Sequence, residues 1–307
     1  LRCNIVTVST DDLPYEEKTI IDHSSSEIST EDAAVLLEAV RKELETDIYK
    51  FYVGTSYRHL TIWDKGEVVE LTPPHDVLGQ KIGQYLPKDD KLREMMKKSY
   101  DILSNHPINV ERMKRGLNPA NSLWFWGAGT RPMLTSFEEK TGHKGAMISA
   151  VDLLKGIAVG AGMKVIEVEG ANGGLDTNYE GKADAAVDVL LNGGCDFAYI
   201  HLEAPDEMGH QGSYERKVKA IENLDKRIIK RVVEKMEAAG EDFRMLVLPD
   251  HPTPVAIRTH VSDPVPYMLY DSTDKKNNTW SYNEKDGEAS GNYIAEGHTI
   301  INRLFEK

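Results

Sequence analysis

The chain has 307 residues, of which 40% are hydrophobic, enough for about two domains whose cores need no disulfide or metal staple. Its 50 acidic and 37 basic residues leave a formal net charge of −13, and a surface of that sign repels phosphate backbones. The composition therefore argues against nucleic acid and membranes as partners, and no apolar run approaches the roughly 18–20 residues of a membrane helix. Two cysteines, Cys3 and Cys195, exclude a disulfide framework, so we expect a reducing compartment, the cytoplasm.

The first residues read as a strand already in progress. Leu1–Val8 is apolar and β-rich, and it has no initiating methionine, no polar lead-in and no pattern of an export signal. We therefore expect the chain to be a fragment that lacks its N-terminal part.

Region 1–116 mixes strands and helices. A helix is predicted over about Thr30–Thr46, because Ser29 and Asp32 fit the capping-box spacing and apolar residues follow at helical intervals. Charged helices are expected over about Lys88–Arg115, with a break at position 107, where a proline ends or kinks a helix. This composition of elements is typical of an α+β module.

A β-hairpin is predicted inside this module. Leu60–Trp63 and Glu67–Leu71 are both β-rich, and Gly66 between them supplies the positive φ that a tight turn requires. The β-rich segment Ile48–Val53 precedes the hairpin.

From residue 117 onward, short apolar runs alternate with helical segments. The predicted strands are Leu123–Trp126, Ala146–Ile148, Val165–Val168, Phe197–Leu202, Met245–Leu248 and Val265–Leu269. The predicted helices are Val151–Ala161, Gly181–Leu191 and Tyr214–Ala239, and the polar stretch 274–292 is interpreted as a surface loop. Such alternation predicts an α/β fold, a parallel sheet wrapped in helices. Sheets of this kind place their chemistry at the carboxyl ends of the strands.

Five ligand-type side chains stand beside these strand ends: Asp206, His210, Asp250, His251 and His260. Asp206 and His210 are four residues apart, so one helical turn directs both towards one cation. Imidazole combined with carboxylate suits Zn²⁺ or Mn²⁺. Asp250 and His251 either serve one ion or reach towards two, and two ions about 4 Å apart are a common device for phosphoryl displacement. The plainer alternative is that His251, between prolines, only fills a turn.

The motifs that carry these residues resemble a known family. They are Asp206-x₃-His210, Pro249-Asp250-His251-Pro252-Thr253-Pro254 and Arg258-Thr259-His260. They are similar to the cofactor-independent phosphoglycerate mutases, in the archaeal-type branch, which is part of the alkaline phosphatase superfamily. Further matching segments are 2–7, 56–59, 72–76, 122–127, 148–153 and 176–178, and the resemblance runs from residue 1 to about residue 270.

The resemblance implies an alkaline phosphatase-like α/β sheet with helices on both faces and a smaller α/β cap domain inserted into it. We expect residues 1–116 to form the cap, which holds the substrate. Residues 117–307 are expected to form the metal-binding domain, without its N-terminal strand and nucleophile segment.

The resemblance also implies a reaction, the metal-dependent interconversion of 3-phosphoglycerate and 2-phosphoglycerate through a phosphoserine, without 2,3-bisphosphoglycerate. Two divalent ions (Mn, Zn or Mg) are expected, one held by Asp206, His210 and His260, the other in part by Asp250 and His251. In the family, an Asp and the nucleophilic Ser complete the second set, and both precede the first residue of this chain. No catalytic nucleophile is therefore assigned within it.

Four side chains are candidate contacts to the phosphorylated carboxylic acid: Arg58, His59, Arg131 and Lys144. Arginine is the usual bidentate partner of phosphate and carboxylate, but a structural role for each is equally open. His201, within a predicted strand, is interpreted as a core or supporting histidine.

Two alternatives stay open. The same site serves proposed homoserine kinases, phosphatases or other phosphotransferases of the superfamily, although no nucleotide-binding loop is visible. The chain could also be a catalytically inactive truncated or binding form.

Overall fold

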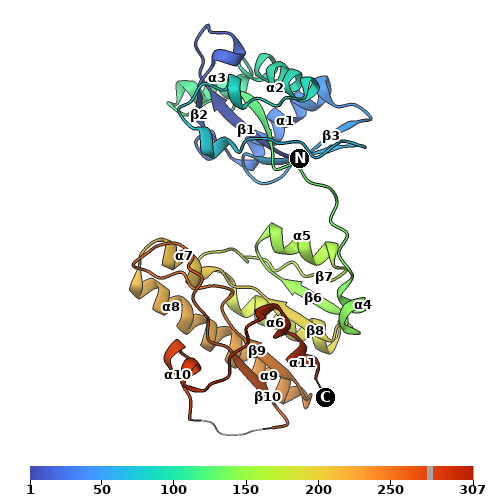
Figure 1. Ribbon diagram of the computed structural model, residues 1–307, viewed down its shortest axis with the longest axis vertical. Helices are drawn as coiled ribbons and strands as arrows, with labels where there is room; N and C mark the ends of the chain where they lie inside the picture. Colours follow the sequence, from blue (N-terminus) through green and yellow to red (C-terminus); the bar gives the residue numbers. More distant parts are fainter. Residues whose placement is uncertain (275–278, 307) are drawn as a thin grey trace. The chain divides into compact units, whose positions relative to one another are not determined.

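The computed structural model describes residues 1–274 and 279–306, and it divides into two compact units after Arg131 (Figure 1). The boundary predicted at 116/117 is therefore too early. Strand β5 (Ser122–Trp126) pairs antiparallel with β1 (Arg2–Val8), so β5 completes the sheet of the first unit.

Strand β1 is the centre of the first unit's sheet. It pairs with β5 along one edge and with β4 (Arg58–Trp63) and β2 (Ile20–Asp22) along the other, and β4 pairs with the edge strand β3 (Tyr49–Tyr52). All of these pairings are antiparallel. The apolar sides of the sheet and of the helices α1 (Thr30–Leu44) and α2 (Asp90–Leu103) form one core.

The helices of this unit follow the sequence signals. The Ser29 hydroxyl accepts a hydrogen bond from the Asp32 amide at 3.1 Å and begins α1, whose apolar stripe is buried as predicted. The predicted break falls at Pro107, the first residue of α3 (Pro107–Lys114), and the His106 imidazole caps that helix.

The predicted hairpin is wrong. Strand β4 pairs with β3 before it, and no residue of 67–71 is in a strand. The buried residues of β3 and β4 alternate in matching register, which places one apolar side of both strands in the core. Lys65 takes the positive φ, 54°, whereas Gly66 is required because any Cβ there would collide with the Trp63 indole.

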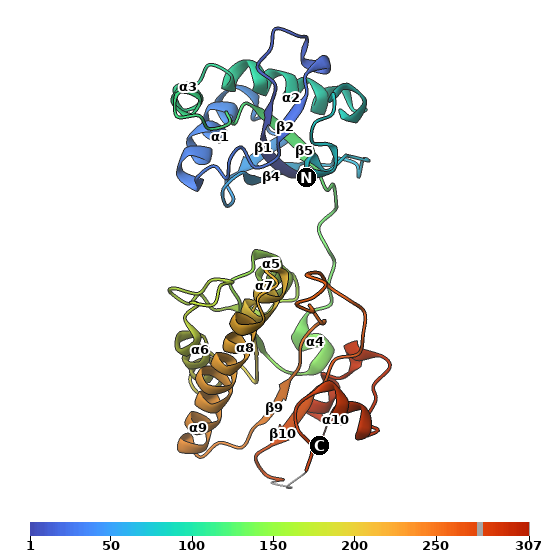
Figure 2. The same ribbon diagram turned by 90° about the vertical axis from the view of Figure 1, so that its left-hand side faces the viewer.

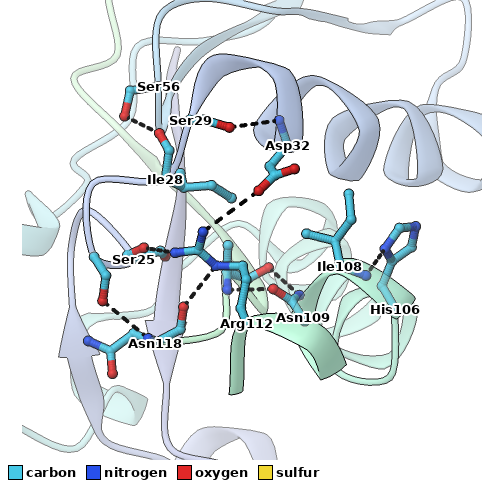
Figure 3. A network of polar contacts seen from close by, with 12 residues as sticks. Ser25, Ile28, Ser29, Asp32, Ser56, His106, Ile108, Asn109, Arg112 and Asn118 are labelled. Carbon is cyan, nitrogen blue, oxygen red and sulfur yellow. Dashed lines mark hydrogen bonds and ion pairs between the residues drawn. The ribbon is translucent and has the colours of Figure 1, made fainter. Parts of the chain in front are cut away.

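A left-handed turn follows β2. Residues Ser25, Ser26 and Glu27 have φ of 50°, 56° and 50°, which L-residues adopt at a cost of roughly 1–2 kcal/mol each. The buried Arg112 guanidinium holds this turn, since it donates to the Ser25 carbonyl and, at 3.1 Å, to the Asn118 carbonyl (Figure 3). The strain of the turn is offset by these charged hydrogen bonds.

The Asp22 carboxylate also holds this turn. It accepts hydrogen bonds from the backbone amides of Ser24 at 2.8 Å and Ser26 at 2.6 Å, and from the Asn118 side-chain amide at 2.9 Å. Burial opposes ionisation of this carboxyl, but the hydrogen bonds outweigh it and hold its pKa at about 2.

The second unit contains a parallel sheet in the order β7 (Lys164–Val165), β6 (Gly145–Ile148) and β8 (Phe197–Ile200). Among the described residues, β9 (Arg244–Val247) and β10 (Met268–Asp271) pair only with each other, and they are antiparallel. A parallel pair needs a crossover, usually helical, and the connection between these two strands contains no helix. The prediction of one parallel sheet is wrong for both strands.

Helices cover both faces of the parallel sheet, as predicted. The helices of this unit are α4 (Phe137–Thr141), α5 (Asp152–Gly160), α6 (Tyr179–Leu191), α7 (Ala204–His210), α8 (Tyr214–Leu224), α9 (Lys230–Ala239), α10 (Glu284–Ala289) and α11 (Asn302–Phe305). Ala198 and Ile200 of β8 lie in apolar clusters with residues of α6. Phe197, on the opposite face, stacks on Phe137 of α4 and meets Phe305 of α11.

The predicted helix 214–239 is continuous, with a π-turn at Asp225–Ile229 between α8 and α9. It lies beside α6 (Figure 2), and Arg227 and Arg231 pair with Glu180 and Asp184 of that helix, each through two hydrogen bonds. No helix of the described residues is long and apolar enough to cross a membrane.

The predicted surface loop 274–292 is interrupted by α10. Positions 275–278 of that prediction lie outside the described residues.

We predict that Asp22→Asn lowers the stability of the protein at pH 7 by about 1.5–3 kcal/mol, the worth of hydrogen bonds to a charged group. The folded pKa is depressed, so the stabilisation is complete above the unfolded value of about 4 and is lost as the pH falls through about 2. The difference between variant and wild type should therefore shrink below pH 4. Urea unfolding followed by tryptophan fluorescence measures it, since Trp63, Trp124 and Trp126 belong to this unit.

Asp47→Asn is the control, because Asp47 is exposed in the same unit. A difference between Asp22→Asn and wild type that stays constant down to pH 2 would contradict the assignment.

Candidate metal centre

Two segments of the second unit bring the ligand-type side chains together. Strand β8 leads into α7, a helix of 7 residues on which Asp206 and His210 lie one turn apart. Strand β9 leads into the connection to β10, which carries Asp250, His251 and His260. The carboxyl ends of β8 and β9 thus supply the candidate site. The strand-end rule applies to β8, which is in the parallel sheet, but not to β9, which pairs antiparallel with β10 outside that sheet.

Asp206 is the centre of the cluster. The His260 Nε2 lies 3.2 Å from its Oδ1, and the His210 Nε2 lies 3.3 Å from its Oδ2. The two Nε2 atoms are themselves 3.0 Å apart. One ligand atom each from Asp206, His251 and His260 also lie within 4.8 Å of one another. Four of the five predicted ligands therefore share one small volume.

The hydrogen bonds around the cluster identify the free lone pair of His210. Its Nδ1 lies 3.0 Å from the Arg258 carbonyl, which only accepts, so Nδ1 carries the proton. The Nε2 lone pair then faces the His260 ring and the Asp206 carboxylate. A metal-binding histidine is typically held in this way through its other ring nitrogen. Imidazole nitrogens converging on a carboxylate fit a divalent cation such as Zn²⁺ or Mn²⁺.

Asp250 lies at the rim of the cluster. Its side chain is 68% exposed, its Oδ1 accepts from the His251 amide at 3.1 Å, and its Oδ2 lies 3.4 Å from the His251 Nε2. The His251 ring lies with its centroid 3.7 Å from that of His260. His251 is thus shared between Asp250 and the central cluster, which places the two predicted ligand sets side by side.

Buried polar groups lie beside these ligands. The His201 Nδ1 is 3.3 Å from the Ser149 hydroxyl, and the fully buried Lys182 donates to the His201 carbonyl at 3.1 Å. Burial lowers the pKa of both His201 and Lys182, while burial raises the pKa of Glu203. His201 has the supporting position that the sequence suggested, at the end of β8.

Comparison with known proteins decides the family. Residues 54–296 match the pattern of the metalloenzyme superfamily. A 2,3-bisphosphoglycerate-independent phosphoglycerate mutase of Methanosarcina barkeri is 50% identical over 279 residues, which cover 89% of this chain and 68% of that protein. The chain belongs to the cofactor-independent phosphoglycerate mutases. A protein of the same name from Methanothrix thermoacetophila is 40% identical over 307 residues, covering 99% of this chain and 76% of its own.

Solved structures show the same fold. A protein of Pyrococcus horikoshii superposes with a TM-score of 0.74 at 25% identity, covering 99% of this chain and 72% of that one. The cofactor-independent phosphoglycerate mutase of Thermoplasma acidophilum gives a TM-score of 0.64 at 23% identity, covering 99% and 75%. The predicted family and its alkaline phosphatase-like α/β fold class are confirmed.

The first two candidate substrate contacts lie on opposite sides of the first unit's sheet. Arg58 is exposed, with its guanidinium 4.4 Å above the Tyr57 ring. His59 is buried, its Nδ1 accepts from the Gly54 amide at 3.2 Å, and burial lowers its pKa to about 4. Adjacent residues of a strand point to opposite faces, so Arg58 is available to a ligand from solvent and His59 is not.

The other two candidates, Arg131 and Lys144, both lie outside the helices and strands. Arg131 is exposed in a segment without secondary structure at the end of the first unit. Lys144 directly precedes β6, whose register with β8 places it at the amino ends of the parallel strands. The metal cluster follows the carboxyl ends, about 13 Å away at 3.3 Å per residue, so the structure does not bring Lys144 to it.

A row of rings and guanidinium groups in the first unit was missed. In order, it consists of Arg58, Tyr57, His23, His75, Trp126 and Arg2. Each residue is in ring–ring or cation–π contact with the next one in this order. Among the described residues, the buried His23 Nδ1 has no hydrogen-bond partner. All of these residues except His23 lie in the matching segments 2–7, 56–59, 72–76 and 122–127, which is the signal that could have indicated the row.

We predict that Mn²⁺ at about 100 times its Kd raises the free energy of unfolding of the wild type by about 2.7 kcal/mol. Asp206→Asn should abolish that increase, because Asp206 contacts both His210 and His260. Chemical denaturation with and without the ion measures the effect. Asp196→Asn, at the amino end of β8, should leave the increase intact, and an Asp206→Asn protein that kept it would refute the metal assignment.

Proposed function

We propose that the protein interconverts 3-phosphoglycerate and 2-phosphoglycerate in a metal-dependent reaction. The observation that carries this proposal is the convergence of Asp206, His210 and His260 within 3.3 Å of one another in a member of the mutase family. The substrate is a small phosphorylated carboxylic acid, and 2,3-bisphosphoglycerate is not required.

The donor set favours Mn²⁺ or Zn²⁺ over Mg²⁺, because imidazole nitrogens suit the first two ions. Asp206, His210 and His260 would hold one ion, and Asp250 and His251 would help to hold a second. Bound divalent ions at such a site lower the pKa of a coordinated hydroxyl and neutralise charge on phosphoryl oxygens.

The chain's own residues orient those ligands. The Arg258 carbonyl fixes the proton on His210 Nδ1, and Lys182 holds the His201 backbone beside the site. The phosphoserine route that the family resemblance implies assigns the attack to a serine, and none of the candidate ligands has that role. The candidate ligands and the groups around them therefore bind and orient.

The first unit is proposed to bind the substrate's anionic groups. Arg2 pairs with Leu60 across β1 and β4, and Arg58 is two residues from Leu60 on the same strand. Both arginines therefore project from one face of the sheet, where both are exposed. A guanidinium fork matches the two oxygens of a carboxylate or phosphate. Arg131, exposed at the end of the unit, is a further candidate.

A kinase or phosphatase activity has less support. The two relatives described above are named mutases. The metal cluster is common to the superfamily and does not select a substrate, and the comparisons do not favour a non-catalytic form. Both cysteines are free, which agrees with the cytoplasmic location that we propose.

We predict that His260→Ala in the whole protein lowers turnover of 3-phosphoglycerate by more than about 100-fold, the upper end of the loss for residues that only support a metal ligand. A coupled assay of 2-phosphoglycerate formation in the presence of Mn²⁺ measures it. Wild-type turnover by this variant would contradict the proposal. So would a wild type that phosphorylates homoserine from ATP and leaves phosphoglycerate unchanged.

We also predict that Arg58→Met raises KM by about 10–100-fold, because a charged hydrogen bond is worth about 1.5–3 kcal/mol. The change in kcat should be smaller, since the contact is made to the bound substrate before and during reaction. Arg41→Met is the control, because Arg41 pairs with Glu38 and Glu45 on α1. Equal KM values for the two variants would remove Arg58 from the substrate site.

A further inference from the structure

Thr253 is a buried residue in the loop that carries Asp250 and His251, and only 3% of it is exposed. Its backbone lies directly against α7, at Gly209. A Cβ on Gly209 would collide with the Thr253 carbonyl and crowd its methyl group. The absence of a side chain at position 209 therefore lets the loop approach the helix between its two ligands, Asp206 and His210.

The Thr253 hydroxyl contacts two candidate ligands at once. It donates a hydrogen bond to Asp206 Oδ1, and it lies 3.3 Å from His251 Nδ1. A hydroxyl has one hydrogen, and a carboxylate only accepts, so that hydrogen goes to Asp206. The remaining contact is then a bond that His251 Nδ1–H donates to the hydroxyl oxygen. This assignment leaves the Nε2 of His251, which lies 3.4 Å from Asp250 Oδ2, with a lone pair that can bind a cation.

A third contact holds Thr253 in place. The Lys217 ammonium, from α8, donates to the Thr253 carbonyl at 2.6 Å. Lys217 is half-buried, and such a charge-assisted hydrogen bond restrains the backbone on which the hydroxyl stands. Helix α8 thus restrains the loop, and the loop in turn restrains a ligand on α7.

We propose that Thr253 is a positioning residue of the metal centre. Its one hydroxyl sets the orientation of the Asp206 carboxylate and the tautomer of His251, and it joins the two segments that carry these ligands. This inference rests on the proposed function, in which Asp206 and His251 bind divalent ions. A metal ligand typically depends on such a neighbour, whose loss weakens metal affinity by about 10–100-fold.

The test compares Thr253→Val and Thr253→Ser in the whole protein. Valine keeps the shape and removes the hydroxyl, whereas serine keeps the hydroxyl. We expect Thr253→Val to weaken Mn²⁺ binding, measured by calorimetry, by about 10–100-fold and to change the visible spectrum of the Co²⁺-loaded protein. Thr253→Ser should restore both to wild-type values, which a purely structural role would not require.

Thr273→Val is the matched control. Thr273 also donates its hydroxyl hydrogen to an aspartate, Asp271, at 2.6 Å, but both residues stand at the end of β10, outside the metal cluster. This control should bind Mn²⁺ as tightly as the wild type. A Thr253→Val protein with the wild-type affinity and Co²⁺ spectrum would overturn the inference and leave the proposed function standing. A wild type that binds no Mn²⁺ would overturn both.

A measurement on the wild type covers the case in which Thr253→Val fails to fold. Long-range nitrogen–proton NMR spectra of the metal-free, histidine-labelled protein distinguish the two neutral tautomers. The His251 ring is expected to carry its proton on Nδ1. A ring protonated on Nε2 would overturn the inference without any variant.

Discussion

The candidate metal centre depends on one electrostatic constraint, the close approach of two imidazole nitrogens. The Nε2 atoms of His210 and His260 are 3.0 Å apart, and both face the Asp206 carboxylate. Lone pairs at that distance repel unless a proton or a cation lies between them, so this geometry persists only where neighbouring groups hold each ring. The Arg258 carbonyl holds one ring, and the contact of Thr253 with Gly209 holds the loop that brings the others.

The convergence of the candidate ligands could be predicted from the sequence, but the residues that hold these ligands in place could not. The helical spacing of Asp206 and His210 indicates that both side chains point in one direction. The ends of the predicted strands indicate where side chains from different segments meet. Thr253 has no such signal, because a threonine between two prolines is equally typical of a turn. Its partners Asp206 and Lys217 are 47 and 36 positions away in the chain. Contacts of that range are decided by tertiary packing, which periodicity does not report.

The same limit explains the errors in the fold. Helix α1 was predicted well, because its cap and apolar stripe are local signals. The partner of β4 was not predicted correctly, because β-rich segments stand both before and after it in the chain. Only the burial of one face of both strands selects β3. Strand β5 was assigned to the wrong unit because its apolar run suits either sheet. Its partner, β1, lies more than 110 positions earlier in the chain.

The protein and its proposed substrate are both negatively charged, so binding requires local positive charge. A net charge of −13 repels a phosphorylated acid at long range, and salt screens that repulsion beyond about 8 Å. Within that distance, the charged groups closest to the substrate determine whether it is attracted or repelled. Among the described residues, the one convergent set of metal-type ligands lies in the second unit. In the proposed function, the first unit therefore meets the charge of the substrate with arginine side chains. Arg2 and Arg58 are exposed and lie on one face of the first unit's sheet.

The guanidinium groups of these two arginines lie over aromatic rings, those of Trp126 and Tyr57. The rings restrict the arginine rotamers before a ligand binds. That pre-organisation lowers the entropic cost of binding and favours arginine over lysine at both positions.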